Sequence, residues 1–229
     1  TMVLSAPDIL RPTRQIDCSL ELLESASPLK AGSKVRLHLG TSEIKAEVMP
    51  LQGELIRPGK SSFAQLRLTE SAVAVLGDRF IIRQFSPLTT LGGGVVLDNR
   101  APRHRKNELN LGDFLGKLAS GSAEECLSAY SQYRRVTTRK DLQARTGWCK
   151  KEIEISLRSL ESSGKLRKIS TNPIRFIHEE LRKVLTERVL DYLKQFHQEK
   201  PLLAGAPKQE LRFKTFSLTK TPSSPSAET

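Results

Sequence analysis

The chain has 229 residues, 38% hydrophobic and 27% charged, which is the composition of a soluble globular protein with one large domain or two small ones. It contains no apolar run that could span a membrane and no N-terminal signal-peptide pattern, which excludes a helical membrane protein. Its net charge of +12 is divided unevenly: residues 1–100 hold 12 Lys and Arg against 10 Asp and Glu, and residues 101–229 hold 25 against 15. The basic second half favours a polyanionic partner such as nucleic acid, although a solvated basic surface explains this charge equally well.

Three cysteines, Cys18, Cys126 and Cys149, are spread along the chain. Their number is odd and their spacing is not that of paired ligands, which argues against a disulfide framework or a zinc site. Free cysteines are typical of a reducing compartment, so we expect a cytoplasmic protein.

Residues 15–100 are predicted to form a small antiparallel β-barrel or sandwich. Alternation of apolar and polar residues predicts strands at 15–23, 33–40, 44–48 and 62–69, and two more apolar runs follow at 72–76 and 79–85. Six or more short strands at close spacing, with no helical pattern between them, are typical of such folds. Residues 1–14, with two prolines, are interpreted as the tail of an upstream domain or a linker.

Residues 92–94 are three consecutive glycines, which invite comparison with a phosphate-binding loop. Such a loop needs a helix directly after it, because the amides at the helix N-terminus hold the anion. Here an apolar strand follows, without a Lys-Ser or Lys-Thr pair, so we predict a turn with a bend or bulge and no nucleotide site. The chain supplies no nucleophile, metal cluster or acid–base pair, and we expect no catalytic residue, no metal and no enzyme activity.

Residues 101–108 form a basic connector, and residues 109–178 are predicted to fold as a winged helix. A weakly helical stretch with two glycines covers 109–118, and Ser122 with Glu125 forms a capping-box pattern that begins a helix over 122–133. A short helix over 139–146, capped by Thr137 or Thr138, precedes a third helix over 150–163. Two strands, 165–170 and 174–178, then surround a turn, which completes the order typical of winged helices.

Residues 179–214 are interpreted as the start of a second, incomplete winged helix. An amphipathic helix is predicted over 179–198, with Leu181, Leu185, Val189, Tyr192 and Phe196 along one stripe. A loop and a second helix follow over 200–214. Residues 215–229 are low in apolar side chains, and we expect a disordered tail.

Several segments resemble SelB-type bacterial selenocysteine-specific elongation factors. LRPTRQIDCSLELL (10–23), VRLHLGTSEIKAEV (35–48), RPGKSSFAQLRL (57–68) and GDRFIIRQFSPLTTLGGGVVLD (77–98) are similar to the third, barrel-shaped domain of that family. GDRFIIR is also similar to the third domain of the wider elongation factor Tu group. LDYLKQFHQEKPLLAGAPKQELR (190–212) is similar to the start of the family's second winged helix.

The resemblance implies a part in translation. The intact family member uses GTP and Mg²⁺ to deliver selenocysteyl-tRNA to the ribosome at UGA codons, guided by an mRNA hairpin that the most C-terminal winged helix grips. No GxxxxGK[ST] occurs in this sequence, so the GTPase domain is expected to be absent, and so is the final winged helix. The resemblance therefore implies a monomeric fragment that offers RNA-binding and scaffold surface, without a cofactor of its own, and whose partners are selenocysteyl-tRNA and the ribosome.

Candidate RNA contacts come from two regions. In winged helices the third helix and the wing usually contact nucleic acid, and the family's barrel packs on the tRNA. The candidates are Arg79, Arg83, Arg103, Arg105, Lys106, Lys150, Lys151, Arg158, Lys165, Arg167 and Lys168. The acidic neighbours of the third helix also fit an ordinary charged surface, and winged helices are common as protein-interaction and spacer modules as well. The alternative function is a winged-helix DNA-binding transcriptional regulator with a β-barrel partner domain.

Overall fold

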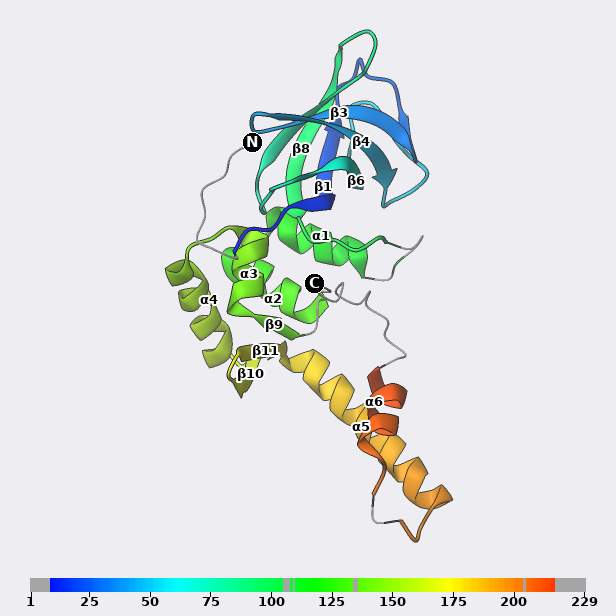
Figure 1. The fold of residues 1–229 in the computed structure, drawn as a ribbon, viewed down its shortest axis with the longest axis vertical. Helices are drawn as coiled ribbons and strands as arrows, with labels where there is room; N and C mark the ends of the chain where they lie inside the picture. The colour runs from blue at the N-terminus through cyan, green and yellow to red at the C-terminus, as the bar shows by residue number, and fades with distance from the viewer. Residues whose placement is uncertain (1–8, 105–107, 109, 134–135, 204, 217–229) are drawn as a thin grey trace.

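The computed structural model describes residues 9–104, 108, 110–133, 136–203 and 205–216 (Figure 1). The barrel lies at one end of the long axis, the winged-helix domain lies in the middle, and a helical pair extends to the other end. The antiparallel barrel followed by α+β winged-helix structure is the fold class that the sequence predicts.

Six strands close the barrel in the order β1-β6-β4-β3-β7-β8. They are β1 (Thr13–Leu22), β3 (Ser33–Leu39), β4 (Ser42–Pro50), β6 (Ser61–Ala72), β7 (Arg79–Arg83) and β8 (Thr90–Asp98), and a small ribbon pairs β2 (Leu29–Lys30) with β5 (Leu55–Ile56). The alternation in the sequence directs one face of each strand inward, as in β3 and β4, where Leu37 is opposite Ile44 and both are buried.

The predicted strand over 72–76 is wrong. β6 ends at Ala72, and the residues after it form a turn in which the backbone N–H of Val75 donates to the carboxylate of Asp78 at 2.9 Å. The backbone N–H of Leu76 donates to the carbonyl of Arg145 at 3.0 Å, in the winged-helix domain. The residues after Ala72 therefore contact the winged-helix domain and do not form a strand of the barrel.

The turn predicted at the glycines is also wrong, because Gly92, Gly93 and Gly94 lie inside strand β8, but the predicted irregularity is present beside them, where the register of β7 and β8 shifts between the pairs Ile82–Gly92 and Arg83–Thr90. A Cβ atom on Gly94 would lie 2.0 Å from the carbonyl oxygen of Ser19, and one on Gly92 would lie 2.1 Å from that of Glu21. Both carbonyls belong to the neighbouring strand β1. Glycine is therefore required by the close approach of two strands and not by a turn.

The winged-helix domain contains helices α1 to α4 and a three-stranded sheet of order β10-β11-β9. Its elements are α1 (Leu111–Ser120), α2 (Ala123–Tyr133), β9 (Val136–Thr138), α3 (Arg139–Thr146), α4 (Lys150–Ser162), β10 (Leu166–Thr171) and β11 (Ile174–His178). α1 is a regular helix despite its two glycines, because Leu111, Phe114, Leu115 and Leu118 bury one continuous stripe.

The predicted caps of these helices are confirmed. Ser122 and Glu125 hydrogen-bond to each other's backbone N–H groups, and Thr138 forms a capping box with Asp141. Thr138, and not Thr137, is the cap of α3, because Thr137 is buried and contacts the hydroxyl of Ser131 at 3.1 Å.

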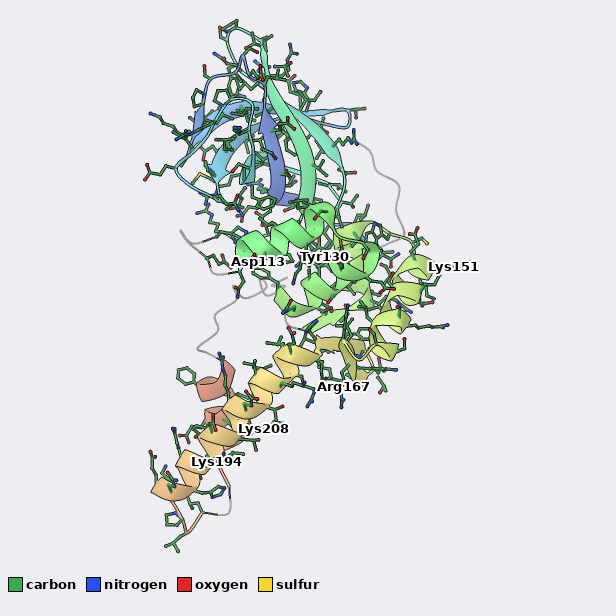
Figure 2. All side chains as sticks on the ribbon, turned by 180° about the vertical axis from the view of Figure 1, so that it is seen from behind. Asp113, Tyr130, Lys151, Arg167, Lys194 and Lys208 are labelled. Carbon is green, nitrogen blue, oxygen red and sulfur yellow. The ribbon has the colours of Figure 1, made fainter. Side chains whose placement is uncertain are left out.

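Two helices extend from the winged helix: α5 (Glu179–Glu199) and α6 (Lys208–Phe216). The predicted stripe of α5 is only half-buried, with Phe196 as its one buried member, and Lys194 points outward (Figure 2). Most of the predicted tail, 217–229, lies outside the described residues, whereas 215–216 belong to α6. None of the helices in the described ranges is long and apolar enough to cross a bilayer.

Candidate nucleic-acid interface

The barrel and the winged helix share one hydrophobic contact. Leu97 of β8 is buried in the same cluster as Phe114, Leu115 and Tyr130 of the winged-helix domain. Leu76 from the turn after β6 packs against this cluster. A surface that uses residues of both domains is therefore held in a fixed geometry.

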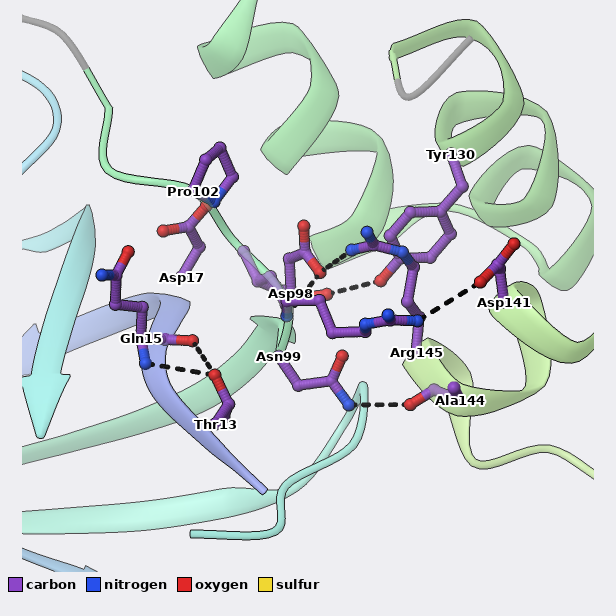
Figure 3. A network of polar contacts seen from close by, with 12 residues as sticks. Thr13, Gln15, Asp17, Asp98, Asn99, Pro102, Tyr130, Asp141, Ala144 and Arg145 are labelled. Carbon is purple, nitrogen blue, oxygen red and sulfur yellow. Dashed lines mark hydrogen bonds and ion pairs between the residues drawn. The ribbon is translucent and has the colours of Figure 1, made fainter. Parts of the chain in front are cut away.

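Polar groups strengthen this junction (Figure 3). Asp98, at the end of β8, is fully buried and forms an ion pair with Arg145 of α3. The guanidinium of Arg145 lies over the ring of Tyr130, 5.6 Å from its centroid, and the Tyr130 hydroxyl donates to the carbonyl of Leu97 at 2.8 Å. Asn99 donates its side-chain amide to the carbonyl of Ala144 at 2.8 Å, so α3 is fixed to the end of the barrel.

A second buried cluster lies where the chain leaves the barrel. His104 contacts Asp17 of β1 through Nε2 at 2.6 Å and Glu108 through Nδ1 at 2.7 Å. Burial lowers the pKa of His104, but the hydrogen bonds and charges of Asp17 and Glu108 outweigh it and raise the pKa overall. Burial raises the pKa of Asp17, and His104 offsets only part of that effect. The predicted basic connector thus carries a structural histidine.

A groove of about 1000 Å³ runs along the winged-helix domain beside this junction. It is formed by the segment before β1, the end of β8, α3, α4 and the wing, β10 and β11. Its lining residues are Ile9, Arg11, Arg100, Thr138, Arg139, Lys140, Asp141, Ala144, Glu154, Leu157, Arg158, Glu161, Lys168, Thr171, Asn172, Pro173, Ile174 and Phe176.

The groove is basic. Its lining contains six Lys and Arg against three Asp and Glu. Arg100 pairs with Asp141 at 3.4 Å, and Arg139 pairs with Glu154. Burial lowers the pKa of Arg100. The positive charges of Arg145 and Arg11 lower this pKa further, because the three cations lie close together.

The candidates on the third helix and the wing divide into two groups. Arg158 and Lys168 line the groove. Lys150 and Lys151 are exposed at the start of α4 outside its lining, and Lys151 points away from the barrel (Figure 2).

Lys165 and Arg167 also lie outside the lining of the groove. Both are exposed, and Arg167 pairs with Glu179 at 3.3 Å, at the start of α5. The six candidates of this region therefore do not form a single surface.

The candidates of the barrel region are also dispersed. Arg79 is exposed at the start of β7, and Arg103 is exposed beyond the junction. Arg83 donates to the carbonyl of Leu88 at 3.0 Å and so supports the loop after β7. Arg105 and Lys106 lie outside the described residues.

Sequence reasoning missed four basic residues of the groove: Arg11, Arg100, Arg139 and Lys140. Arg139 and Lys140 stand in the first turn of α3, where positive charge opposes the helix dipole, and this signal could have identified them. No local pattern distinguishes Arg11 and Arg100, because only the packing of the two domains brings them to α3.

No group of His, Cys, Asp and Glu that could hold a metal ion occurs in the part of the chain that the structure describes. The glycine-rich segment is an internal strand of the barrel, without the helix N-terminus that a phosphate loop uses. The basic groove is therefore the feature with the clearest binding chemistry, and that chemistry suits a polyanion.

Two family models match segments of this chain. The family model described as "Selenocysteine-specific elongation factor, beta-barrel domain" matches residues 16–103, and the model described as "Elongation factor SelB, winged helix" matches residues 190–223. In both segments the chain is similar to SelB-type proteins. The SelB-type resemblance of the barrel and of the segment from residue 190 is thereby confirmed.

A curated protein from Desulfomicrobium baculatum, named selenocysteine-specific elongation factor, is 28% identical to this chain over 212 residues. The match covers 91% of the chain and 33% of the relative, so the chain spans about a third of the relative's length. The crystal structure of the bacterial selenocysteine-specific elongation factor EF-Sec has the same fold, with a TM-score of 0.61 and 15% identity over 90% of this chain and 30% of that one. These matches do not favour the DNA-binding regulator.

Proposed function

We propose that this chain is the barrel and winged-helix part of a selenocysteine-specific elongation factor, in which it offers RNA-binding and scaffold surface. The observation that carries the proposal is the match, over 91% of the chain, to a protein of that name. The direct packing of Leu97 into the winged-helix core supports a scaffold role, because it sets the direction in which the helical domains leave the barrel.

The proposed partners are selenocysteyl-tRNA and the ribosome. A-form RNA is recognised largely through phosphates and 2′-hydroxyls, which suits the exposed basic residues Arg79 and Arg103 on the barrel side. We assign contact with the mRNA hairpin to winged helices of the intact factor other than those of this chain. GTP, Mg²⁺ and hydrolysis are assigned to a GTPase domain, so we expect this chain to act as a cytoplasmic monomer without enzyme activity.

Equilibrium binding across a salt series tests this function. We expect the chain to bind selenocysteyl-tRNA more tightly than a DNA duplex of similar charge, because the tRNA offers shape and 2′-hydroxyls as well as phosphates. The same affinity for both, with the same steep dependence on salt, would mean phosphate attraction alone and would contradict the proposal. Saturable GTP binding by the chain at micromolar concentration would contradict the assignment of the nucleotide site elsewhere.

A further inference from the structure

We propose that the basic groove between the segment before β1, α3, α4 and the wing binds the phosphodiester backbone of an RNA strand. The class of partner rests on the proposed function, whereas the position of the site rests on the groove itself. The site differs from the expected surface at the start of the third helix, because it includes residues from the barrel entrance and excludes Lys150 and Lys151.

Each wall of the groove contributes one cation that has no ion pair among the described residues. Arg11 comes from the segment before β1, Lys140 from α3, Arg158 from α4 and Lys168 from β10. All four are exposed, so they can reach a ligand without breaking an internal contact. Four cations from separate segments around one groove suit a chain of regularly spaced phosphates.

The two paired arginines hold the walls of the groove in place. Arg139 at the start of α3 pairs with Glu154 of α4, and Arg100 after β8 pairs with Asp141 of α3. Asp98 and Asn99 anchor α3 to the barrel end next to them. The groove therefore exists before a ligand arrives, and binding does not have to pay for its assembly.

The distribution of charge favours an RNA strand over a DNA duplex. A winged helix that reads DNA inserts its third helix into the major groove, but α4 carries three basic and three acidic residues and is neutral overall. The excess positive charge lies instead in the concave groove beside α4. The exposed side chains of Pro173 and Ile174 add apolar lining on which sugars and base faces can rest.

Fluorescence anisotropy with a labelled single-stranded RNA of about 12 nucleotides tests the site. The groove variant is Lys140→Glu with Arg158→Glu in the full 229-residue chain. The matched control is Lys150→Glu with Lys151→Glu, which makes the same change in net charge at exposed positions outside the groove. Circular dichroism spectra establish that both variants fold.

We expect the groove variant to weaken RNA binding by tenfold or more, roughly, and the control by less than about twofold at about 0.1 M salt. Four phosphate contacts predict a slope near −3 for log K against log salt, at about 0.7 per contact for a single strand. The neutral variant Lys140→Gln with Arg158→Gln should reduce that slope by about 1.4.

Equal loss of affinity in the groove variant and the control would overturn the proposal, because net charge alone would then explain binding. The chain could instead bind a DNA duplex or an acidic peptide more tightly than RNA and lose that binding in the groove variant. This result would assign the groove to another partner and would also overturn the proposal. The two proposals can fail separately. The groove variant can lose more RNA affinity than the control even if the chain does not prefer selenocysteyl-tRNA to DNA. The chain can also show that preference even if both variants lose the same affinity.

Discussion

At the scale of single residues, Gly94 is one of the positions in β8 where the barrel tolerates no side chain. A Cβ atom there would lie 2.0 Å from the Ser19 carbonyl and 2.8 Å from the ring of Phe80. We expect Gly94→Ala to destabilise the protein by about 1–3 kcal/mol or more, because strands β1 and β8 must separate. Urea unfolding measures this change.

Gly116→Ala is the matched control for that substitution. Gly116 lies inside α1 with nothing within 4 Å of its Cβ position, so alanine should stabilise the helix by about 0.5–1 kcal/mol. Opposite signs for two glycine-to-alanine changes are the expected outcome. An unchanged midpoint for Gly94→Ala would show that β1 and β8 are not so close.

Arg145 of α3 forms the buried ion pair that crosses the junction to Asp98. Arg145→Ala removes the cation that pairs with the fully buried Asp98, and loss of one partner of a buried ion pair typically costs about 3–5 kcal/mol. Lys194→Ala removes a cation from an ion pair that is exposed on both sides, and we expect little effect. Thermal unfolding of both variants makes the comparison, and equal midpoints would contradict a junction stabilised by the Asp98 pair.

At the scale of elements, the sequence predicts those features whose cause is local. The alternation of β3 and β4, the cap of α3 at Thr138 and its end at Gly147 with a φ of 71° follow from adjacent residues. The segment after Ala72 was assigned to the wrong kind of element because Leu76 pairs with Arg145, about seventy residues later. Its apolar character is real, but its partner lies in another domain.

The difference between local features and contacts between domains also explains which residues of the groove the sequence predicts. Helix and wing periodicity identified Arg158 and Lys168, which line the groove. The sequence could not indicate that Arg11 and Arg100 join them, because that depends on how the barrel end packs against α3. It also grouped Lys150 and Lys151 with them, although neither residue lines the groove.

At the scale of the whole molecule, the His104 cluster links barrel and winged helix and makes stability depend on pH. The pKa of His104 is raised in the folded state, so its contribution is complete below its unfolded pKa of about 6.5 and is lost as pH rises through the folded value. The raised pKa of Asp17 acts in the same direction in the acid range. We expect the melting temperature to fall as the pH rises above about 6.5.

His104→Asn should flatten this dependence, whereas His197→Asn, at an exposed position of α5, should retain it. Measurement above pH 6.5 avoids the opposite contribution of His178, whose pKa is lowered by burial. Melting curves at several pH values make the test. A wild-type midpoint that rises over this range would contradict a protonated His104 between Asp17 and Glu108.

Competition at a single salt concentration tests the central claim most directly. Labelled selenocysteyl-tRNA bound to the 229-residue chain is challenged with unlabelled selenocysteyl-tRNA or with a DNA duplex of equal charge. A SelB-type RNA-binding scaffold predicts that the tRNA displaces the probe at a concentration roughly tenfold or more below that of the duplex. Displacement by both at the same concentration would contradict it.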